Sequence, residues 1–422
     1  MFPRGQIDIR WADLGVALGR TMFPGDVAAL SREVAAAWHA DGVVFLTVRT
    51  GFDVMLQALA LPVGSEVVCT AVNIPDMFEL LEHHGLVPVP VDLDPRTLAP
   101  DPAAVEAAIT PQTRAVLVTH LLGARMPMDG LHAVAAAHGL PVWEDCAQAF
   151  DGRYVGHADT AVAMFSFGPI KTATALGGGL FRVSDPALRQ ALWSGQDAHP
   201  LQSRRSWLGV VLNYGVMRLL SEPALYGLFV QVCAVAGTSH DQIINGRVLG
   251  LKGADWWAAL RRRPSAPLLA LLRRRVETYP ASQVDERAAV ARALVRLLPA
   301  DAPVLGAGAT LNVFWQFVLT PADPEGLVAA LRTAGFDATT GASRLGPARA
   351  PAGRPAPARI AAAMARAVYV PAYTRIPAPA RERLGQAIRE ALSAQPAGGG
   401  QPSSDSSSSS RPGAPSSRVA SA

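Results

Sequence analysis

Between residues 43 and 143 the sequence alternates short apolar runs with segments of helical spacing. The apolar runs, rich in β-branched residues, cover 43–47, 66–70, 87–91, 115–119 and 140–143. Strands that read as continuous apolar runs are typical of a parallel sheet, because helices cover such a sheet on both faces. The alternation therefore predicts a large α/β domain built on a mostly parallel sheet.

Polar residues follow the apolar run at 140–143 and the next apolar run along the chain. Glu144 and Asp145 end the run at 140–143, and Phe165-Ser166-Phe167 ends the next one. Lys171 stands just beyond, ahead of Gly177-Gly178-Gly179. An acid at one strand end and a lysine past another suit pyridoxal phosphate. The acid keeps the pyridine nitrogen protonated, and the lysine amine condenses with the aldehyde. We therefore predict pyridoxal phosphate as the cofactor, Asp145 as the partner of its ring nitrogen and Lys171 as the catalytic residue.

The same stretch carries three motifs in one order. They are Glu144-Asp145-Cys146-Ala147-Gln148, the segment 156–159, and Phe165-Ser166-Phe167 followed by Lys171 and the glycines. In this order and at these spacings they resemble the DegT/DnrJ/EryC1/StrS aminotransferases, which use pyridoxal phosphate to aminate keto-sugars. The resemblance implies the fold of the type I aminotransferases, with a large parallel-sheet domain and a smaller C-terminal α+β domain.

The resemblance also implies roles for four further residues. Gln148 is expected near the phenolic oxygen of the cofactor and Ser166 at its phosphate, although both have an alternative as plain polar residues at strand ends. Thr50 and Gly51 lie where a strand feeds a helix, and the free N–H groups of such a helix start favour an anion. They are predicted to form part of the phosphate cup, with an ordinary turn and N-cap as the alternative.

Four positions leave the family pattern or have two interpretations. Val72 stands where the family places an aromatic residue that stacks on the pyridine ring. Leu176 and Gly177 stand where a glycine and an acid are expected. His120 ends a strand, where it either contacts a ligand or makes a structural hydrogen bond. We expect the glycines to let the backbone pass close to the cofactor.

The resemblance and the order of the predicted elements imply two domains, and a shift in composition marks a tail after them. We predict a large cofactor-binding domain over residues 1–250, a small domain over 251–394 and a disordered tail over 395–422, where Gly, Pro and Ser dominate. Residues 209–237 are long and apolar, but they carry charges that are costly at a bilayer centre. Two amphipathic helices broken at Pro223 fit better. They either cover a core or interface, or they lie on a membrane surface.

Charge and cysteine content exclude several classes of protein. The formal net charge is only +4, and no basic stripe with interleaved aromatics indicates a nucleic-acid partner. The three cysteines, Cys69, Cys146 and Cys233, have no metal-binding spacing and no disulfide pattern, which favours a reducing compartment. No metal is expected. The first residues lack an apolar signal segment. We predict a cytoplasmic protein, peripheral to the membrane if residues 209–237 contact it.

The predicted activity follows from the motifs and the resemblance together. Lys171 would move a proton between the α-carbon of an amino-acid donor and the cofactor, and the amino group would pass to a keto-sugar, expected to be nucleotide-linked. The resemblance implies glutamate or glutamine as donor, a homodimer, and a role in polysaccharide or secondary-metabolite synthesis. The alternative is a non-catalytic protein of the same fold that serves as a membrane-surface or assembly partner in polysaccharide synthesis.

Overall fold

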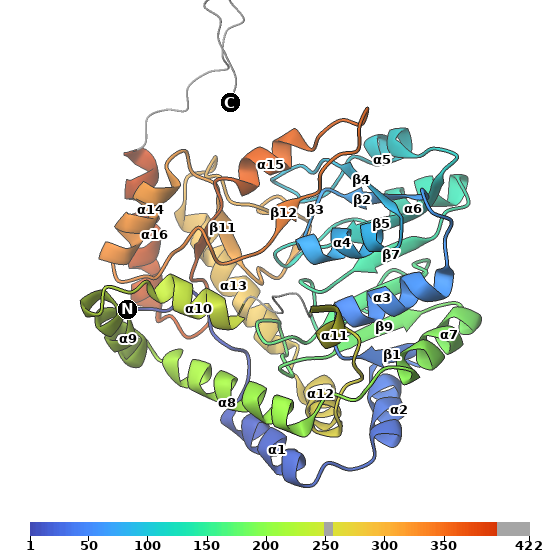
Figure 1. Ribbon diagram of the computed structural model, residues 1–422. Helices are drawn as coiled ribbons and strands as arrows, with labels where there is room; N and C mark the ends of the chain where they lie inside the picture. The colour runs from blue at the N-terminus through green and yellow to red at the C-terminus, as the bar shows by residue number, and fades with distance from the viewer. Residues whose placement is uncertain (249–255, 395–422) are drawn as a thin grey trace, which may run out of the picture.

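A seven-stranded sheet forms the centre of the molecule (Figure 1), in a computed structural model that describes residues 1–248 and 256–394. The strand order is β1-β9-β8-β7-β5-β2-β4. The bounds are β1 (Gly42–Phe45), β2 (Glu66–Thr70), β4 (Val87–Val91), β5 (Thr113–Thr119), β7 (Val142–Asp145), β8 (Val162–Ser166) and β9 (Gly179–Val183). Only β9 runs antiparallel to its neighbours in this sheet, to β8 and to β1. The mostly parallel sheet predicted from the alternation is confirmed.

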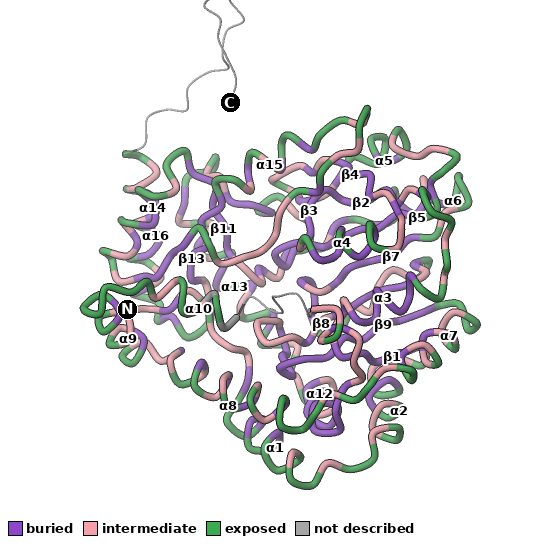
Figure 2. Tube along the Cα trace, viewed as in Figure 1, coloured by how far each residue is buried: buried purple, intermediate pink, exposed green. Residues whose placement is uncertain are grey.

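Helices cover both faces of the sheet. Val43 and Phe45 point into the core on one face and Val44 into the core on the other, because neighbouring strand residues alternate in direction. On the first face lie α3 (Val48–Leu59), α4 (Pro75–His83) and α7 (Pro186–Asp197). On the second lie α1 (Trp11–Met22), α2 (Val27–Trp38), α5 (Pro102–Ala108), α6 (Asp129–Ala137) and α12 (Ala266–Thr278). Figure 2 shows the strands between them as mainly buried.

A second, smaller core lies at the C-terminal end of the chain. It joins β11 (Phe317–Leu319) and β13 (Val368–Val370), which pair antiparallel, with α13 (Ser282–Leu297), α14 (Pro324–Thr333) and α16 (Ala378–Ser393). α15 (Ala358–Met364) packs beside it. Because four leucines of α12 belong to the core of the large sheet, the small core begins later than the predicted boundary at residue 250. The predicted tail, residues 395–422, lies outside the described residues.

Residues 311–319 contain two short strands that belong to different sheets. β10 (Leu311–Asn312) pairs with β6 (Ala124–Arg125) in the large domain, and β11 pairs with β13 in the small core. Between them Phe314 adopts a positive φ of 45°, which ends the first strand. A second short pair, β3 (Val72–Asn73) with β12 (Gly346–Pro347), also links the two parts of the chain.

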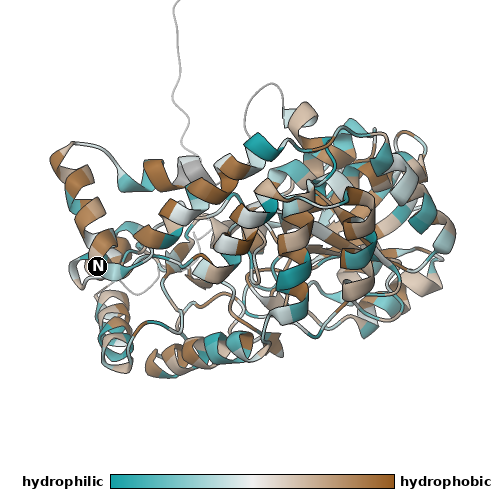
Figure 3. Ribbon diagram, turned by 90° about the horizontal axis from the view of Figure 1, so that it is seen from below, coloured by the Kyte–Doolittle hydropathy of each residue, from teal (hydrophilic) through white to brown (hydrophobic). Residues whose placement is uncertain are grey.

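The apolar segment folds as the predicted pair of helices, α8 (Arg204–Leu220) and α9 (Pro223–Val235), broken at Pro223. α10 (His240–Val248) and α11 (Trp256–Leu260) follow. Several large apolar side chains of α8 and α9 are exposed: Leu212, Val216, Leu219, Leu228, Val232 and Val235. In Figure 3 the helices beside the N-terminus are largely brown. Within residues 1–248 and 256–394, no helix combines the length and the apolar character needed to cross a bilayer.

Candidate active site

Asp145 occupies the carboxyl end of β7, in the middle of the sheet, and its side chain is buried. Its Oδ2 accepts a hydrogen bond of 2.9 Å from Nδ2 of Asn73, and its Oδ1 accepts one of 3.0 Å from the N–H of Ala147. Asn73 Nδ2 also donates to Oγ1 of Thr119 at 2.9 Å. The carboxylate is therefore fixed in orientation from two sides.

Lys171 lies in the loop between β8 and β9 and keeps partial exposure. Its Nζ stands 4.2 Å from the centroid of the Trp315 ring, and the indole N–H of Trp315 donates to the carbonyl of Ile170 at 3.0 Å. Burial of the amine lowers the pKa of Lys171; the Asp145 carboxylate opposes this, Arg49 adds to it, and the pKa settles at about 8. The neutral, nucleophilic share of this amine at physiological pH is therefore far larger than that of an ordinary lysine, whose pKa is 10.5.

The N-terminal segment holds the loop that carries Lys171. Oδ2 of Asp8 accepts hydrogen bonds from the N–H of Ala173 at 2.9 Å and from the hydroxyl of Tyr279 at 2.7 Å. Arg275 donates to the Asp8 carbonyl at 2.6 Å and to the Thr174 carbonyl at 3.0 Å. Ala173 has a φ of 55°, a conformation that a residue with a Cβ rarely adopts. Contacts outside the loop thus stabilise an unusual backbone next to the lysine.

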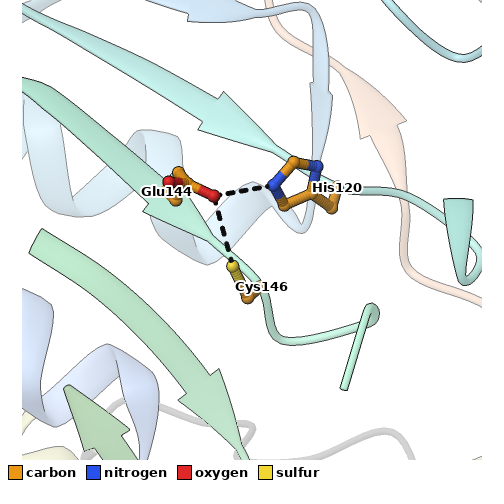
Figure 4. Close-up of side chains that lie close together, drawn as sticks. All are labelled: His120, Glu144 and Cys146. Atoms are coloured by element: carbon orange, nitrogen blue, oxygen red, sulfur yellow. Dashed lines mark hydrogen bonds and ion pairs between the residues drawn. The ribbon is translucent and has the colours of Figure 1, made fainter. Parts of the chain in front are cut away.

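Glu144, the neighbour of Asp145, is the centre of a buried hydrogen-bond network (Figure 4). Its carboxylate accepts from Nε2 of His120 at 3.0 Å, from the Tyr154 hydroxyl at 2.7 Å, from the N–H of His157 at 2.8 Å, and from the Thr160 hydroxyl. Burial acts to raise the pKa of Glu144, but these bonds, first that of His120, outweigh it and hold the pKa at about 2. The network anchors the end of β7.

This network decides between the two interpretations of His120. The ring is wholly buried; Nε2 faces Glu144, and Nδ1 accepts from the N–H of Met126 at 3.3 Å. The structural hydrogen bond is therefore the correct interpretation. Ligand atoms of His120, Glu144 and Cys146 lie within 4.8 Å of one another. However, burial raises the pKa of the Cys146 thiol well above its usual range, so it stays protonated at neutral pH and suits hydrogen bonding better than metal binding.

Gln148 lies in the turn just after Asp145, and Ser166 ends the neighbouring strand β8, so both follow carboxyl ends of the sheet. Oε1 of buried Gln148 accepts from the N–H of Leu122 at 2.9 Å, so the side chain closes the turn after β5. Ser166 ends β8, is partly exposed, and accepts a long bond of 3.4 Å from the N–H of Gly168. The predicted contacts of both residues with the cofactor stay predictions.

Thr50 and Gly51 lie in the first turn of α3, but their N–H groups already have partners. The N–H of Thr50 donates to Oγ1 of the N-cap Thr47 at 3.1 Å, and that of Gly51 to the Thr47 carbonyl at 3.1 Å. The Thr50 hydroxyl donates to the Leu260 carbonyl at 2.8 Å. The structure thus contains the turn and N-cap, while the role of Thr50 and Gly51 at the phosphate stays a prediction. The N–H groups of Val48 and Arg49 precede the first bond within the helix and are left for an anion.

The two departures from the family pattern also have structural explanations. Val72 is fully buried in an apolar cluster between the two parts of the chain. A Cβ on Gly177 would approach Leu268, one on Gly178 would approach Leu272, and both leucines belong to α12. The small size of these glycines thus accommodates helix packing, and the expectation that they bring backbone close to the cofactor stays a prediction.

The donor set of the site fits pyridoxal phosphate. The ring nitrogen of that group requires a fixed carboxylate, which Asp145 supplies, and its aldehyde requires an amine of lowered pKa, which Lys171 supplies. The two residues also act on each other electrostatically. Arg49 supplies a positive charge at the start of α3, although its guanidinium also pairs with Asp76. Asp145 and Lys171 would hold the cofactor at its two reactive ends.

Sequence reasoning missed the residues that support this pair from far along the chain. Asp8, Arg287 and Trp315 reach the Lys171 loop from the N-terminal segment, α13 and the β10–β11 connection. Trp315 stood out only as one aromatic of an alternating run. No local signal distinguishes such residues, because the contacts join positions more than 100 residues apart.

Comparisons with known proteins agree with the motifs. Residues 25–199 match the model of the DegT/DnrJ/EryC1/StrS aminotransferase family. The L-glutamine:2-deoxy-scyllo-inosose aminotransferase of Micromonospora echinospora is 38% identical over 183 residues, which make up 42% of this chain and 43% of that protein. The match therefore spans less than half of the relative's length. The predicted family resemblance is confirmed over this part of the chain.

Solved structures resemble the chain over a longer stretch. The sugar aminotransferase CalS13 from Micromonospora echinospora superposes with a TM-score of 0.65 at 20% identity, covering 92% of this chain and 100% of that one. NtdA from Bacillus subtilis, solved with the bound cofactor PMP, gives 0.66 at 16% identity, covering 91% and 83%. At these identities the likeness shows the fold, and the predicted type I aminotransferase fold is confirmed.

Proposed function

We propose, on the premise that residues 25–199 belong to the DegT/DnrJ/EryC1/StrS aminotransferase family, that this chain transfers an amino group from an amino acid to a keto-sugar. The observation that carries the proposal is the pair formed by Asp145 and Lys171: an oriented, buried carboxylate and an amine whose pKa is about 8. Pyridoxal phosphate, bound by these residues, supplies an electron sink that lets an amino acid exchange its amino group for a ketone.

Each residue of the pair has a defined task in this scheme. Lys171 attaches the cofactor and then carries a proton to or from the α-carbon of the donor, a task for which an amine with a pKa near the working pH is suited. Asp145 would hold the ring nitrogen of the cofactor, and the hydrogen bonds from Asn73 and Ala147 keep its carboxylate from rotating away. Trp315 positions the lysine because its ring contacts the amine and its indole N–H donates to the carbonyl of Ile170, the preceding residue.

The substrate class is supported by the nature of the relatives. One is named for glutamine as donor and for a cyclic ketone as acceptor, and a neighbour of the same fold is a sugar aminotransferase. We take glutamine or glutamate as donor and a cyclic polyhydroxylated ketone as acceptor. A nucleotide carrier, a role in polysaccharide or secondary-metabolite synthesis, a homodimer and a cytoplasmic location complete the proposal.

The test uses the absorption of bound pyridoxal phosphate. We expect a visible band in the wild-type protein and in Lys252→Ala, which removes the only other lysine of the sequence, but no such band in Lys171→Ala. L-Glutamine or L-glutamate should convert the band to that of the pyridoxamine form. A cofactor that stays in Lys171→Ala with an unchanged band would refute the role of Lys171.

A second candidate function rests on the exposed apolar side chains of α8 and α9, of which Val235 is 91% exposed and Leu212 56%. A protein of this fold that binds a membrane surface through these helices, without catalysis, would expose such residues. A bound cofactor that neither amino acid converts, together with sedimentation of the protein with anionic vesicles, would favour this candidate over the aminotransferase.

A further inference from the structure

A cavity of about 500 Å³ opens beside Lys171 and Trp315. Its walls come from the N-terminal segment 3–10, from α8 and α9, from α13, and from residues 315–317 and 369–375. A volume of this size suits a small molecule and lies within the usual range of ligand sites. Because the reactive amine lies in the wall, whatever binds here meets Lys171.

Several polar atoms in this wall are buried without a hydrogen-bond partner among the described residues. They include Nε2 of Gln6, Nη2 of Arg287, Oε1 of Gln316 and Oη of Tyr373, beside Nη1 of Arg4. Buried polar groups in proteins are nearly always paired. Such a set of atoms around one cavity therefore indicates a ligand with polar groups of its own, or water in its place.

Arg287 differs from the other arginines of the wall. Arg4 pairs with Asp337, Arg10 with Asp13, and Arg218 and Arg375 both pair with Glu222. The guanidinium of Arg287 uses Nε to donate to the Val313 carbonyl and Nη1 to donate to the Thr172 hydroxyl, both at 3.1 Å.

No ion pair of Arg287 is found within the described ranges 1–248 and 256–394. Asp8 is the nearby acid that acts on its charge, but Arg275 and Tyr279 already occupy the Asp8 carboxylate. Glu286, also in the wall, is exposed. Arg287 is thus a cation without a carboxylate of its own, in the same chamber as the Lys171 amine.

We propose that Arg287 binds the carboxylate of the amino-acid donor in this chamber. A carboxylate takes two parallel hydrogen bonds from a guanidinium, and the free Nη2 supplies a donor for it. Thr172, which Arg287 contacts, follows Lys171 directly in the chain, so a ligand anchored there presents its amino group on the side of the lysine. This assignment rests on the aminotransferase function proposed above and names the site for one of its substrates.

The first test measures binding without catalysis. Calorimetry of the full chain with 2-oxoglutarate, the keto acid of glutamate, should show binding to wild type and to Arg292→Gln, an exposed arginine on the same helix. Arg287→Gln should bind about 10- to 100-fold more weakly, and Arg287→Lys, which keeps the charge without the fork, should fall between them. Equal binding by wild type and Arg287→Gln would overturn the proposal.

Inorganic phosphate serves as the competing oxyanion. If it binds wild type as tightly as 2-oxoglutarate does and loses that binding in Arg287→Gln, the chamber holds a phosphate group and the donor assignment is wrong. Weak phosphate binding that is unaffected by the substitution supports the carboxylate. Circular dichroism of each variant controls for folding.

The second test uses the cofactor-loaded protein and two amines that differ only in the carboxylate, L-glutamine and 4-aminobutanamide. Arg287→Gln should slow the conversion of the cofactor by glutamine about 10- to 100-fold. The slow conversion by 4-aminobutanamide should stay within about threefold of the wild-type rate. Equal losses with both amines would mean a purely structural role and refute the proposal. If wild type converts neither amine, the proposed function fails, while the calorimetry still reports on Arg287.

Discussion

The amine of Lys171 lies 4.2 Å above the ring of Trp315, and the same indole donates its N–H to the carbonyl of Ile170, the residue before the lysine. One side chain therefore contacts both the reactive group and the backbone that carries it. A cation over an aromatic face is stabilised relative to the neutral amine. Trp315 thus counteracts part of the effect of burial on this lysine and limits the positions that the amine can adopt.

Replacing Trp315 by leucine should lower the pKa of Lys171 further below its value of about 8. A cation–π contact worth roughly 0.5–1 kcal/mol corresponds to about half a pKa unit. The rate at which an amine-reactive probe labels the Lys171 peptide, followed against pH by mass spectrometry, reports this pKa. Trp315→Phe keeps the ring and should shift the profile much less. A pKa that rises in Trp315→Leu would contradict the contact.

Glu144→Gln should alter the acid stability of the protein. The pKa of Glu144 is held at about 2 in the folded state, below its ordinary value of 4.5. The stabilisation is therefore fully present above pH 4.5 and is lost as the pH falls toward 2. A gap of this size corresponds to about 3 kcal/mol. Urea unfolding should show that Glu144→Gln is less stable than wild type at pH 7. Its free energy of unfolding should also fall less than that of wild type between pH 7 and pH 4.

The control for this prediction is Glu382→Gln, an exposed residue of α16. Its unfolding curves should follow those of wild type at both pH values. Parallel pH dependence of Glu144→Gln and wild type would show that the network around Glu144 does not favour the ionised carboxylate.

Asp8→Ala should loosen the loop that carries Lys171. The substitution removes the acceptor for the Ala173 N–H and for the Tyr279 hydroxyl, and it leaves the buried Arg275 with only Asp13 as an acidic partner. Unpaired buried donors cost about 1–3 kcal/mol each. Hydrogen exchange of residues 171–178 should speed up about tenfold or more. Asp285→Ala, which breaks an exposed ion pair with Arg153, is the matched control and should leave this loop unchanged.

Gly51→Ala should destabilise the protein even without cofactor. A Cβ at this position would lie 2.6 Å from Cζ of Phe181 and 2.6 Å from Cδ2 of Phe45, so core side chains must shift, at a cost of about 1–3 kcal/mol. Gly209→Ala, in α8 with nothing within 4 Å of the added carbon, should instead be neutral or stabilising. A Gly51→Ala protein that loses stability only when pyridoxal phosphate is present would contradict this packing account and support the prediction that Gly51 acts on the phosphate.

Much of the sheet could be predicted because its information is local. The runs at 66–70 and 87–91 are β2 and β4 to the residue, and the prolines of β4 fit its place at the edge of the sheet. The strand β9 was not predicted, because its residues follow a glycine run that reads as a loop. Its direction depends on pairing with β8 and β1, which no residue of β9 encodes by itself.

The candidate site divides in the same way. Asp145 and Lys171 could be predicted because each follows a strand in a recognisable motif. The helix α1 was missed, although Asp13 on it pairs with Arg274 and Arg275 of α12. That arrangement depends on tertiary contacts across some 260 residues, and a single sequence carries no record of which acid meets which arginine.

The pairing of Ser166 with Gly179 closes the base of the lysine loop, since these residues face each other across β8 and β9. Between these ends residues 172–178 are buried, and Thr172, Ala173 and Thr174 are bonded to Arg287, Asp8 and Arg275. A segment that is fixed at both ends and along its length leaves little room for insertions or deletions. Evolution, or an engineer, would therefore alter the reactivity of Lys171 by substitutions around the loop and not by changes in its length.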